Sequence, residues 1–269
     1  MSRHGGTAII VTKTEARMSQ AAAFYDTMAE HYHLIFQDWD ASMRRQGDVI
    51  AALLPPPVQT GPILDCACGI GTQSLALARL GFQVDASDLS APEVARARRE
   101  GTARGLPLRV WADDMRTLAK APPGHYGAVL CMDNALPHLD SDADIDLALR
   151  AMGERLRPGG LLILSLRDYG PLIRERPTAM PPSLFTDDGA RRIVVQVWDW
   201  QDDRRYIVHL YLSRQTGQGW EDHHFVGRYR AISPEEVAAL AASAGFTDAR
   251  VRVPPDTGFY QPIVTAIRP

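Results

Sequence analysis

Two glycines and an aspartate are spaced as in a nucleoside-binding site. The segment Ile63-Leu64-Asp65-Cys66-Ala67-Cys68-Gly69-Ile70-Gly71-Thr72 places glycines where a strand would turn into a helix, so a ligand can approach the backbone and the helix N-terminus. Asp88 follows about 20 residues later, where a carboxylate can accept hydrogen bonds from ribose hydroxyls. Nicotinamide-binding proteins share both features, and glycines also make simple turns, so this pattern alone does not choose the cofactor.

Three more polar or turn segments adjoin the later apolar stretches: two follow the third and fourth expected strands, and one precedes the fifth. In an open α/β sheet, ligands bind beyond the carboxyl ends of the strands, so segments that follow strands gather at one edge. These segments are Ala112-Asp113-Asp114-Met115, Leu136-Pro137-His138-Leu139 and Arg157-Pro158-Gly159-Gly160.

Arg167 ends an otherwise apolar stretch, residues 161–166. A guanidinium is costly to bury without an anionic partner, and its planar fork suits a carboxylate. We therefore expect Arg167 to bind either an acidic group of the substrate or the side chain of Asp133 or Asp168. Asn134 either contacts an amine or closes a turn.

The elements that must position these residues alternate between strand and helix. Such alternation predicts a parallel, doubly wound sheet, which is a Rossmann-like α/β fold. The expected strands are 62–66, 82–87, 108–112, 128–132 and 161–166, and the expected helices are 72–80, 92–104 and 142–156.

Outside this core the pattern changes. Apolar residues at helical spacing predict two helices between Ala21 and Leu54, which end at Pro55-Pro56-Pro57. Three strand-like stretches without intervening helices, at 191–200, 206–214 and 223–229, predict an inserted antiparallel sheet. A helix at 234–244, capped by Ser233, and strands at 246–253 and 261–267 complete the expected elements.

This pattern predicts four parts of the chain. We expect a mobile arm (1–19), a helical lid (20–57), a ligand-binding core (58–167 and 232–269), and an inserted sheet for substrate binding or oligomerisation (168–231).

Composition limits the function classes. The chain has 269 residues, 45% hydrophobic and 23% charged, which fits a globular enzyme, and its formal net charge of -3 without a basic stretch argues against nucleic acid. Cys66, Cys68 and Cys131 lack a metal-ligand spacing and suit a reducing cytosol, and no apolar run approaches the ~20 residues of a membrane helix. We expect a cytoplasmic protein that binds no metal, nucleic acid or membrane; a homo-oligomer is left open.

Taken together, the motifs resemble those of class I S-adenosylmethionine-dependent methyltransferases. Asp65 to Thr72, Asp133 to Leu139 and Arg167-Asp168-Tyr169 resemble segments of the glycine and glycine/sarcosine N-methyltransferases, within a resemblance that runs roughly from Tyr25 to Tyr229. Ala67 and Asp168 depart from the glycine and asparagine that are usual there. The resemblance implies S-adenosyl-L-methionine as cofactor and a nitrogen of a small amino acid or amine as methyl acceptor.

The resemblance also implies roles for residues. Gly69 and Gly71 would approach the methionine part of the cofactor, Asp88 the ribose, and Asp114 with Met115 the adenine. The full cofactor set is Tyr25, Tyr32, Arg44, Asp65, Ala67, Gly69, Gly71, Asp88, Leu89, Asp113, Asp114, Met115 and Met132. The expected catalytic residues are Asn134, His138, Arg167 and Tyr169, and the expected acceptor-binding residues are Asn134, Arg167, Tyr169, Tyr211 and Tyr229.

Three other functions compete with this prediction. A methyltransferase acting on oxygen, sulfur or a heterocyclic nitrogen of a natural product would keep the same cofactor half. A nicotinamide-dependent oxidoreductase would share the glycine turn and Asp88, and a non-catalytic S-adenosylmethionine-binding protein would hold the cofactor without consuming it.

Overall fold

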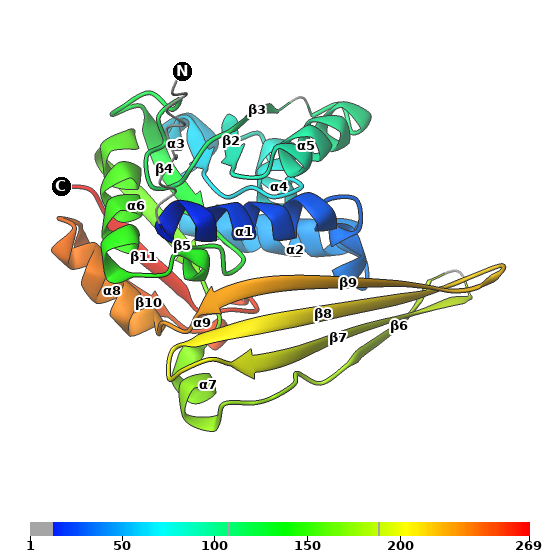
Figure 1. Cartoon of the computed structure of the whole chain (residues 1–269). Helices are drawn as coiled ribbons and strands as arrows, with labels where there is room; N and C mark the ends of the chain where they lie inside the picture. Colours follow the sequence, from blue (N-terminus) through cyan, green and yellow to red (C-terminus); the bar gives the residue numbers. More distant parts are fainter. Residues whose placement is uncertain (1–12, 107, 188) are drawn as a thin grey trace, which may run out of the picture.

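A seven-stranded sheet forms the centre of the computed structural model, which describes residues 13–106, 108–187 and 189–269 (Figure 1). The first five strands in the chain run parallel, and the two C-terminal strands add antiparallel pairs at one edge. In spatial order the strands are β10 (Thr247–Arg252), β11 (Ile263–Ile267), β5 (Leu156–Ser165), β4 (Tyr126–Cys131), β1 (Ile63–Asp65), β2 (Val84–Asp88) and β3 (Arg109–Ala112). The predicted Rossmann-like sheet is therefore confirmed.

Both faces of this sheet are buried. Ile63 and Leu64, successive residues of β1, point into two different apolar clusters, as strand geometry requires. One cluster includes residues of α2 (Trp39–Leu53), α4 (Thr72–Arg79) and α5 (Ala91–Ala103). The other includes residues of α1 (Lys13–Met28), α6 (Asp142–Arg155) and α8 (Pro234–Ser243).

The turn predicted at Arg157-Pro158-Gly159-Gly160 lies within β5. Tyr126 of β4 pairs with Leu156, but Ala128 pairs with Leu161, so the ladder skips the intervening residues. Gly159 has a φ of 75°, which glycine adopts without strain.

The N-terminal helices differ in part from expectation. α1 begins at Lys13, so the prediction of an irregular arm up to residue 19 is wrong for residues 13–19; residues 1–12 of that arm lie outside the described part. The run Ala21-Ala22-Ala23 favours helix and extends it upstream. A 3₁₀ turn, η1 (Tyr32–Ile35), connects α1 to α2. The short α3 (Pro57–Thr60), which was not predicted, begins at the last proline of the run.

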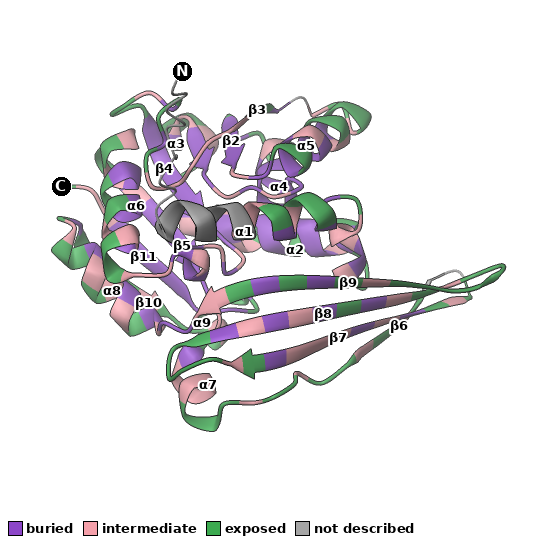
Figure 2. Ribbon diagram, in the orientation of Figure 1, coloured by how far each residue is buried: buried purple, intermediate pink, exposed green. Residues whose placement is uncertain are grey.

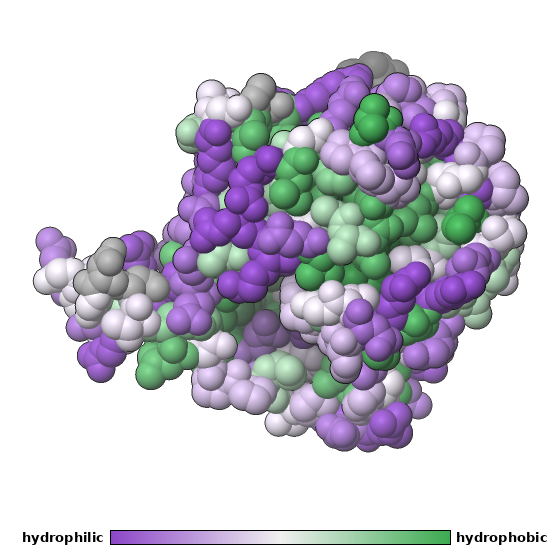
Figure 3. All heavy atoms as spheres, turned by 180° about the vertical axis from the view of Figure 1, so that it is seen from behind, coloured by the Kyte–Doolittle hydropathy of each residue, from purple (hydrophilic) through white to green (hydrophobic). Residues whose placement is uncertain are grey.

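The inserted antiparallel sheet is also confirmed. It consists of β6 (Ser183–Asp187), β7 (Ala190–Trp200), β8 (Arg205–Thr216) and β9 (Gly219–Arg230), and its far end projects from the body of the molecule (Figures 1 and 3). Burial alternates along β8, where Val208 and Leu210 are buried and Tyr211 is exposed (Figure 2). The inner face therefore packs on α1 while the outer face meets solvent. β6 and the preceding helix α7 (Tyr169–Glu175) were not predicted.

The C-terminal part follows its capping signals. Ser233 begins α8 with a complete capping box, and a short helix, α9 (Pro254–Thr257), separates β10 from β11. Within the described ranges, no helix combines the length and apolarity that crossing a bilayer would need.

Candidate functional site

A pocket lies at the carboxyl ends of β1, β2 and β4, under α1. We call it the glycine-turn pocket. Its walls come from the glycine turn, from the segments after β2 and β4, and from the N-terminal helix. The lining residues are Ala21, Ala22, Tyr25, Tyr32, Cys66, Ala67, Cys68, Gly69, Thr72, Gln73, Asp88, Leu89, Ser90, Glu93, Met115, Met132, Asp133, Ala135, His138 and Leu139.

The backbone of the glycine turn is held by Asp88. Gly69 has a φ of 52°, and Gly71, the N-cap of α4, has a φ of 96°, so both occupy the left-handed region that favours glycine. The Gly69 amide donates to Oδ2 of Asp88 at 2.9 Å, and the Ser90 amide donates to Oδ1 at 2.9 Å. Each carboxylate oxygen keeps a further lone pair with which it can accept a ligand hydroxyl.

The electrostatics of this pocket are acidic. Asp88, Glu93 and Asp133 line it, and no lysine or arginine is among its described lining residues. Burial raises the pKa of all three carboxyl groups above their usual values. Beneath them, Asp65 is fully buried with Oδ1 unpartnered, and burial raises its pKa to about 7 although Ser74 donates to its Oδ2 at 2.6 Å.

A second, larger cavity adjoins the first. We call it the lid cavity, and it encloses about 400 Å³ between α1, α2, the inner face of the antiparallel sheet and the loop before β11. Tyr25, Tyr32 and Asp133 line both spaces, so the two meet at these three side chains. The other lining residues are Phe24, Met28, Ile35, Phe36, Ser42, Arg45, Gln46, Val49, Asn134, Arg167, Gln196, Val208, Leu210, Tyr229, Gly258, Phe259, Tyr260 and Gln261.

Arg167 offers a positive charge to the lid cavity. Its guanidinium lies over Trp198, with Cζ 4.8 Å from the ring centroid, and Nη2 donates to Oε1 of Gln196 at 3.1 Å. Nη1 is buried without a hydrogen-bond partner. The Asp133 carboxylate accepts hydrogen bonds from Gln73 and Tyr260, and that of Asp168 accepts one from the Gly170 amide. Among the described residues neither forms an ion pair with Arg167, so the structural alternative considered for this arginine is not observed.

Asp133 and Asn134 form a tight turn after β4. Their φ values are 53° and 66°, and the Asn134 Oδ1 accepts the Arg167 amide at 3.1 Å, which leaves its buried Nδ2 unpartnered. The Asp133 carboxylate accepts Gln73 Nε2 at 2.8 Å and the hydroxyl of Tyr260. The turn thus fixes a carboxylate at the junction of the two cavities.

His138 is held by two hydrogen bonds. Its Nδ1 lies 3.0 Å from the Arg228 carbonyl, which can only accept, so Nδ1 carries the proton. Nε2 therefore accepts from the Tyr25 hydroxyl at 2.8 Å. Burial, with the charge of Arg167, lowers the pKa of His138 to about 4, so the ring is neutral at physiological pH.

Most of the predicted residues lie around these two cavities. In the glycine-turn pocket these are Tyr25, Tyr32, Ala67, Gly69, Asp88, Leu89, Met115, Met132 and His138, and in the lid cavity Tyr25, Tyr32, Asn134, Arg167 and Tyr229. Gly71 and Asp65 support the first pocket from behind without lining it.

Four polar residues of the predicted set lie elsewhere. Arg44 is exposed, because one residue of helical rotation directs Arg45 into the lid cavity instead. Tyr211 stacks on His224 on the outer face, since strand alternation turns it away from the cavity. Asp113 accepts the Trp111 indole and the amides of Asp114 and Lys120, and Asp114 pairs with Arg116 at 2.6 Å.

Tyr169, which was expected to contact the acceptor, also lies outside the two cavities. It is fully buried and lines neither cavity, and its hydroxyl lies 2.7 Å from that of Tyr206. It supports the inner face of the sheet beneath Arg167.

Several lining residues were not predicted. Asp133 follows β4, so its position at a strand end was a usable signal. Glu93 lies one turn into α5, five residues after Asp88. Gln73, Gln196 and Tyr260 come from segments distant in sequence and gave no local signal.

Residues 63–160, which include most strands of the sheet that carries these cavities, match the family described as "Methyltransferase domain". This part of the chain is a methyltransferase domain. The glycine/sarcosine N-methyltransferase of Halorhodospira halochloris is 36% identical over 132 residues, 49% of this chain and 49% of that protein. A ubiquinone biosynthesis O-methyltransferase of Xanthomonas campestris is 36% identical over 124 residues, 46% of this chain and 49% of that protein. The chain thus spans about half the length of these relatives.

A solved structure resembles the methyltransferase domain together with its inserted sheet. It is the S-adenosylmethionine-bound amino pentose methyltransferase CalS10 of Micromonospora echinaspora, with a TM-score of 0.67 and 22% identity over 99% of this chain and 100% of that chain. The fold is that of the class I S-adenosylmethionine-dependent methyltransferases.

The glycine-turn pocket of the methyltransferase domain suits this cofactor. The unpartnered oxygen of Glu93 and the acidic lining favour a ligand with cationic sulfonium and ammonium groups and with hydroxyl donors. The pyrophosphate of a nicotinamide dinucleotide would meet carboxylates without a cation. S-adenosyl-L-methionine is therefore the cofactor that the residues fit.

Proposed function

We propose that the chain transfers the methyl group of S-adenosylmethionine to a nitrogen of a small amine that carries an acidic group, such as an amino acid. The observation that carries this proposal is the Arg167 guanidinium, which ends β5 at the lid cavity with Nη1 buried and unpartnered. An acceptor carboxylate would supply the missing partner in the planar geometry that arginine prefers.

The opposite end of the acceptor has a defined environment as well. Asp133 and the hydroxyls of Tyr25 and Tyr32 lie where the two cavities meet, so an amine bound there would face the cofactor side. The Tyr25 hydroxyl donates a hydrogen bond to His138, so its oxygen has the lone pairs to accept a hydrogen bond from the amine. The Asp133 carboxylate attracts the amine in its ammonium form, and because burial raises its pKa it can take the ammonium proton, which leaves the neutral amine that attacks the methyl group.

Catalysis of this kind depends mainly on alignment. When bound, the cofactor supplies an electrophilic methyl group on a sulfonium. Arg167 and Asp133 would fix the two ends of the acceptor, while α1 and η1 exclude water from the junction. Both ring nitrogens of His138 are occupied and its pKa is about 4, so His138 serves to hold Tyr25 rather than to remove the amine proton.

A second candidate, methylation of a larger natural product, is supported by the size and lining of the lid cavity. Its wall includes apolar side chains from α1, η1, β8 and the loop before β11, namely Phe24, Met28, Ile35, Phe36, Val208, Leu210 and Phe259. CalS10 is an amino pentose methyltransferase, and the lid cavity has room for an amine on a sugar ring.

Product analysis separates these candidates. The chain should be incubated with methyl-labelled S-adenosylmethionine and with pairs of acceptors that differ only in a carboxylate, for example amino acids and their decarboxylated amines, together with amino sugars. We expect label in the amino acids, with mass spectrometry locating it on nitrogen. A preferred acceptor without an acidic group would favour the second candidate, and cofactor binding without any product would indicate a non-catalytic binding protein.

The Arg167→Lys variant tests the assigned contact. It keeps the charge but loses the fork, so we expect the KM for the acidic acceptor to rise roughly tenfold or more while the cofactor dissociation constant changes little. Arg167→Met should abolish the preference between the members of each acceptor pair. Variants that fold and keep the wild-type preference would remove Arg167 from the acceptor site.

A further inference from the structure

Two helices of this chain begin with the same four-residue signature, Ser-x-x-Glu, and use it differently. At Ser233 the complete capping box forms: the Glu236 amide donates to the Ser233 Oγ at 3.2 Å, and the Ser233 amide donates to Oε2 of Glu236 at 2.8 Å. The Glu236 carboxylate is therefore engaged in capping the helix N-terminus.

At Ser90 only half of the box forms. The Glu93 amide donates to the Ser90 Oγ at 3.3 Å, but the Ser90 amide donates to Oδ1 of Asp88. Asp88 thereby takes the hydrogen bond that Glu93 would otherwise accept. The Glu93 carboxylate therefore takes no part in capping the helix.

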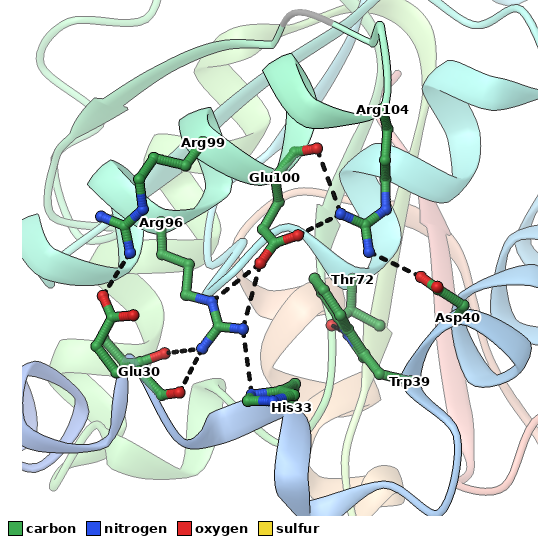
Figure 4. A network of polar contacts seen from close by, with 10 residues as sticks. Glu30, His33, Trp39, Asp40, Thr72, Arg96, Arg99, Glu100 and Arg104 are labelled. Atoms are coloured by element: carbon green, nitrogen blue, oxygen red, sulfur yellow. Dashed lines mark hydrogen bonds and ion pairs between the residues drawn. The ribbon is translucent and has the colours of Figure 1, made fainter.

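The Glu93 side chain lines the glycine-turn pocket. Glu93 is 1% exposed, its Oε1 has no hydrogen-bond partner, and its Oε2 lies 3.0 Å from where a Cβ on Gly69 would be. Arg96, one turn further along α5, directs its guanidinium hydrogen bonds to the carbonyls of Ala29 and Glu30 and to Glu100, and not to Glu93 (Figure 4).

A buried carboxylate oxygen without a donor is costly, and such an oxygen beside a ligand pocket is satisfied when the ligand brings a hydroxyl or amine. Asp88, which the Gly69 amide links to the same turn, already accepts one backbone amide on each oxygen. The ribose of the cofactor presents two adjacent hydroxyls to this region. One carboxylate is available for each of them.

We propose that Glu93 is a second carboxylate of the ribose site, which accepts one ribose hydroxyl while Asp88 accepts the other. The inference depends on the cofactor assignment and is independent of which amine is methylated. Ribose recognition would then depend on Glu93 as well as on Asp88 at the end of β2.

Calorimetry with S-adenosylhomocysteine and its 2′-deoxy and 3′-deoxy analogues tests this assignment. Glu93→Met removes the acceptor but keeps the side-chain length, so we expect S-adenosylhomocysteine to bind about tenfold more weakly or worse. Glu93→Gln keeps an acceptor oxygen and should bind within about threefold of wild type. The deoxy analogue that lacks the partner hydroxyl should bind wild type and Glu93→Met with equal affinity.

Glu236→Met is the matched control, because it breaks the other Ser-x-x-Glu signature far from the pocket. It should lower the melting temperature without changing the affinity for any of the three ligands. An equal loss for all three ligands in Glu93→Met, or no loss for S-adenosylhomocysteine, would overturn the proposal. Failure of the wild-type chain to bind S-adenosylhomocysteine would overturn the cofactor assignment instead.

Discussion

Nε2 of His138 accepts a hydrogen bond from the hydroxyl of Tyr25 at 2.8 Å, across 113 residues of sequence. The contact joins the segment after β4 to α1. It is available only while Nε2 is unprotonated, and this condition makes the contact depend on pH.

This pair predicts a loss of stability in acid. The pKa of His138 falls from 6.5 in the unfolded chain to about 4 in the folded one, so between these values the unfolded state binds more protons. Stability due to His138 is complete above pH 6.5 and is lost as the pH falls towards 4. We expect the difference in unfolding free energy between wild type and His138→Gln to shrink by up to about 3 kcal/mol over this range.

Chemical denaturation at pH 7, 5.5 and 4 measures this difference. Substitution of His125, which is exposed, provides the control and should leave the pH dependence of wild type unchanged. A constant difference between wild type and His138→Gln across these pH values would contradict the neutral, hydrogen-bonded histidine.

Asp133 is expected to be more important for turnover than for cofactor binding. Asp133→Asn keeps the shape of the turn but removes the charge at the junction of the cavities, so we expect kcat/KM to fall about 100-fold, in the range of losses for a positioned polar group. The dissociation constant of S-adenosylhomocysteine should change much less. Steady-state kinetics and calorimetry on the same preparations supply both values.

Tyr260→Phe is the matched control for this variant. It removes the hydroxyl that donates to Asp133 while the carboxylate and its contact with Gln73 remain. Its kcat/KM should stay closer to wild type than that of Asp133→Asn. Equal losses in both variants would mean that the hydrogen-bond network, rather than the carboxylate charge, supports turnover.

Close packing of α2 on α4 predicts a coupling between two small residues. A Cβ on Gly47 would lie 2.6 Å from the Cβ of Ala76, so Gly47→Ala should force the helices apart and cost about 1–3 kcal/mol despite the better helix propensity of alanine. Ala76→Gly removes the obstructing atom. The loss of unfolding free energy in the double variant Gly47→Ala/Ala76→Gly should therefore be smaller than the sum of the losses in the two single variants, as measured by urea denaturation. Equal values would argue against the contact.

The sheet could be predicted because its strands are short apolar runs that alternate with helices ended by glycine or proline. The cofactor half of the site was equally accessible, because Gly69 and Asp88 adjoin strand ends and strand ends share an edge. Local sequence contains this information.

The errors have tertiary causes. Arg44 and Arg45 are both polar helix residues, and only the packing of α2 on α4 fixes which of them faces the cavity. Apolar residues lie on both faces of β8, such as Ile207 and Val208, so its pattern did not reveal the side on which Tyr211 lies. The position of Glu93 depends on Asp88 taking the Ser90 amide, which no residue of α5 could indicate.

The remaining prediction concerns the segment that covers the glycine-turn pocket. The Nη1 of Arg96 donates to the carbonyls of Ala29 and Glu30, at 2.8 and 2.6 Å, and Nη2 lies 3.1 Å from Nδ1 of His33 (Figure 4). Arg96 is 6% exposed, and it bonds to the chain between α1 and η1, next to the pocket residues Tyr25 and Tyr32. One side chain of the core therefore fastens the end of α1.

Arg96→Met should release this segment, because the hydrogen bonds to its backbone are lost and no neighbouring side chain replaces them. We expect faster hydrogen exchange in the peptide that contains residues 25–36 and weaker binding of S-adenosylhomocysteine, with exchange slowed again when that ligand is added. Arg99→Met is the matched control: its partner Glu30 and Arg99 itself are both largely exposed, at 65% and 57%, so exchange should match wild type. Unchanged exchange in Arg96→Met would show that α1 is held by the antiparallel sheet alone, and that the segment does not act as a lid.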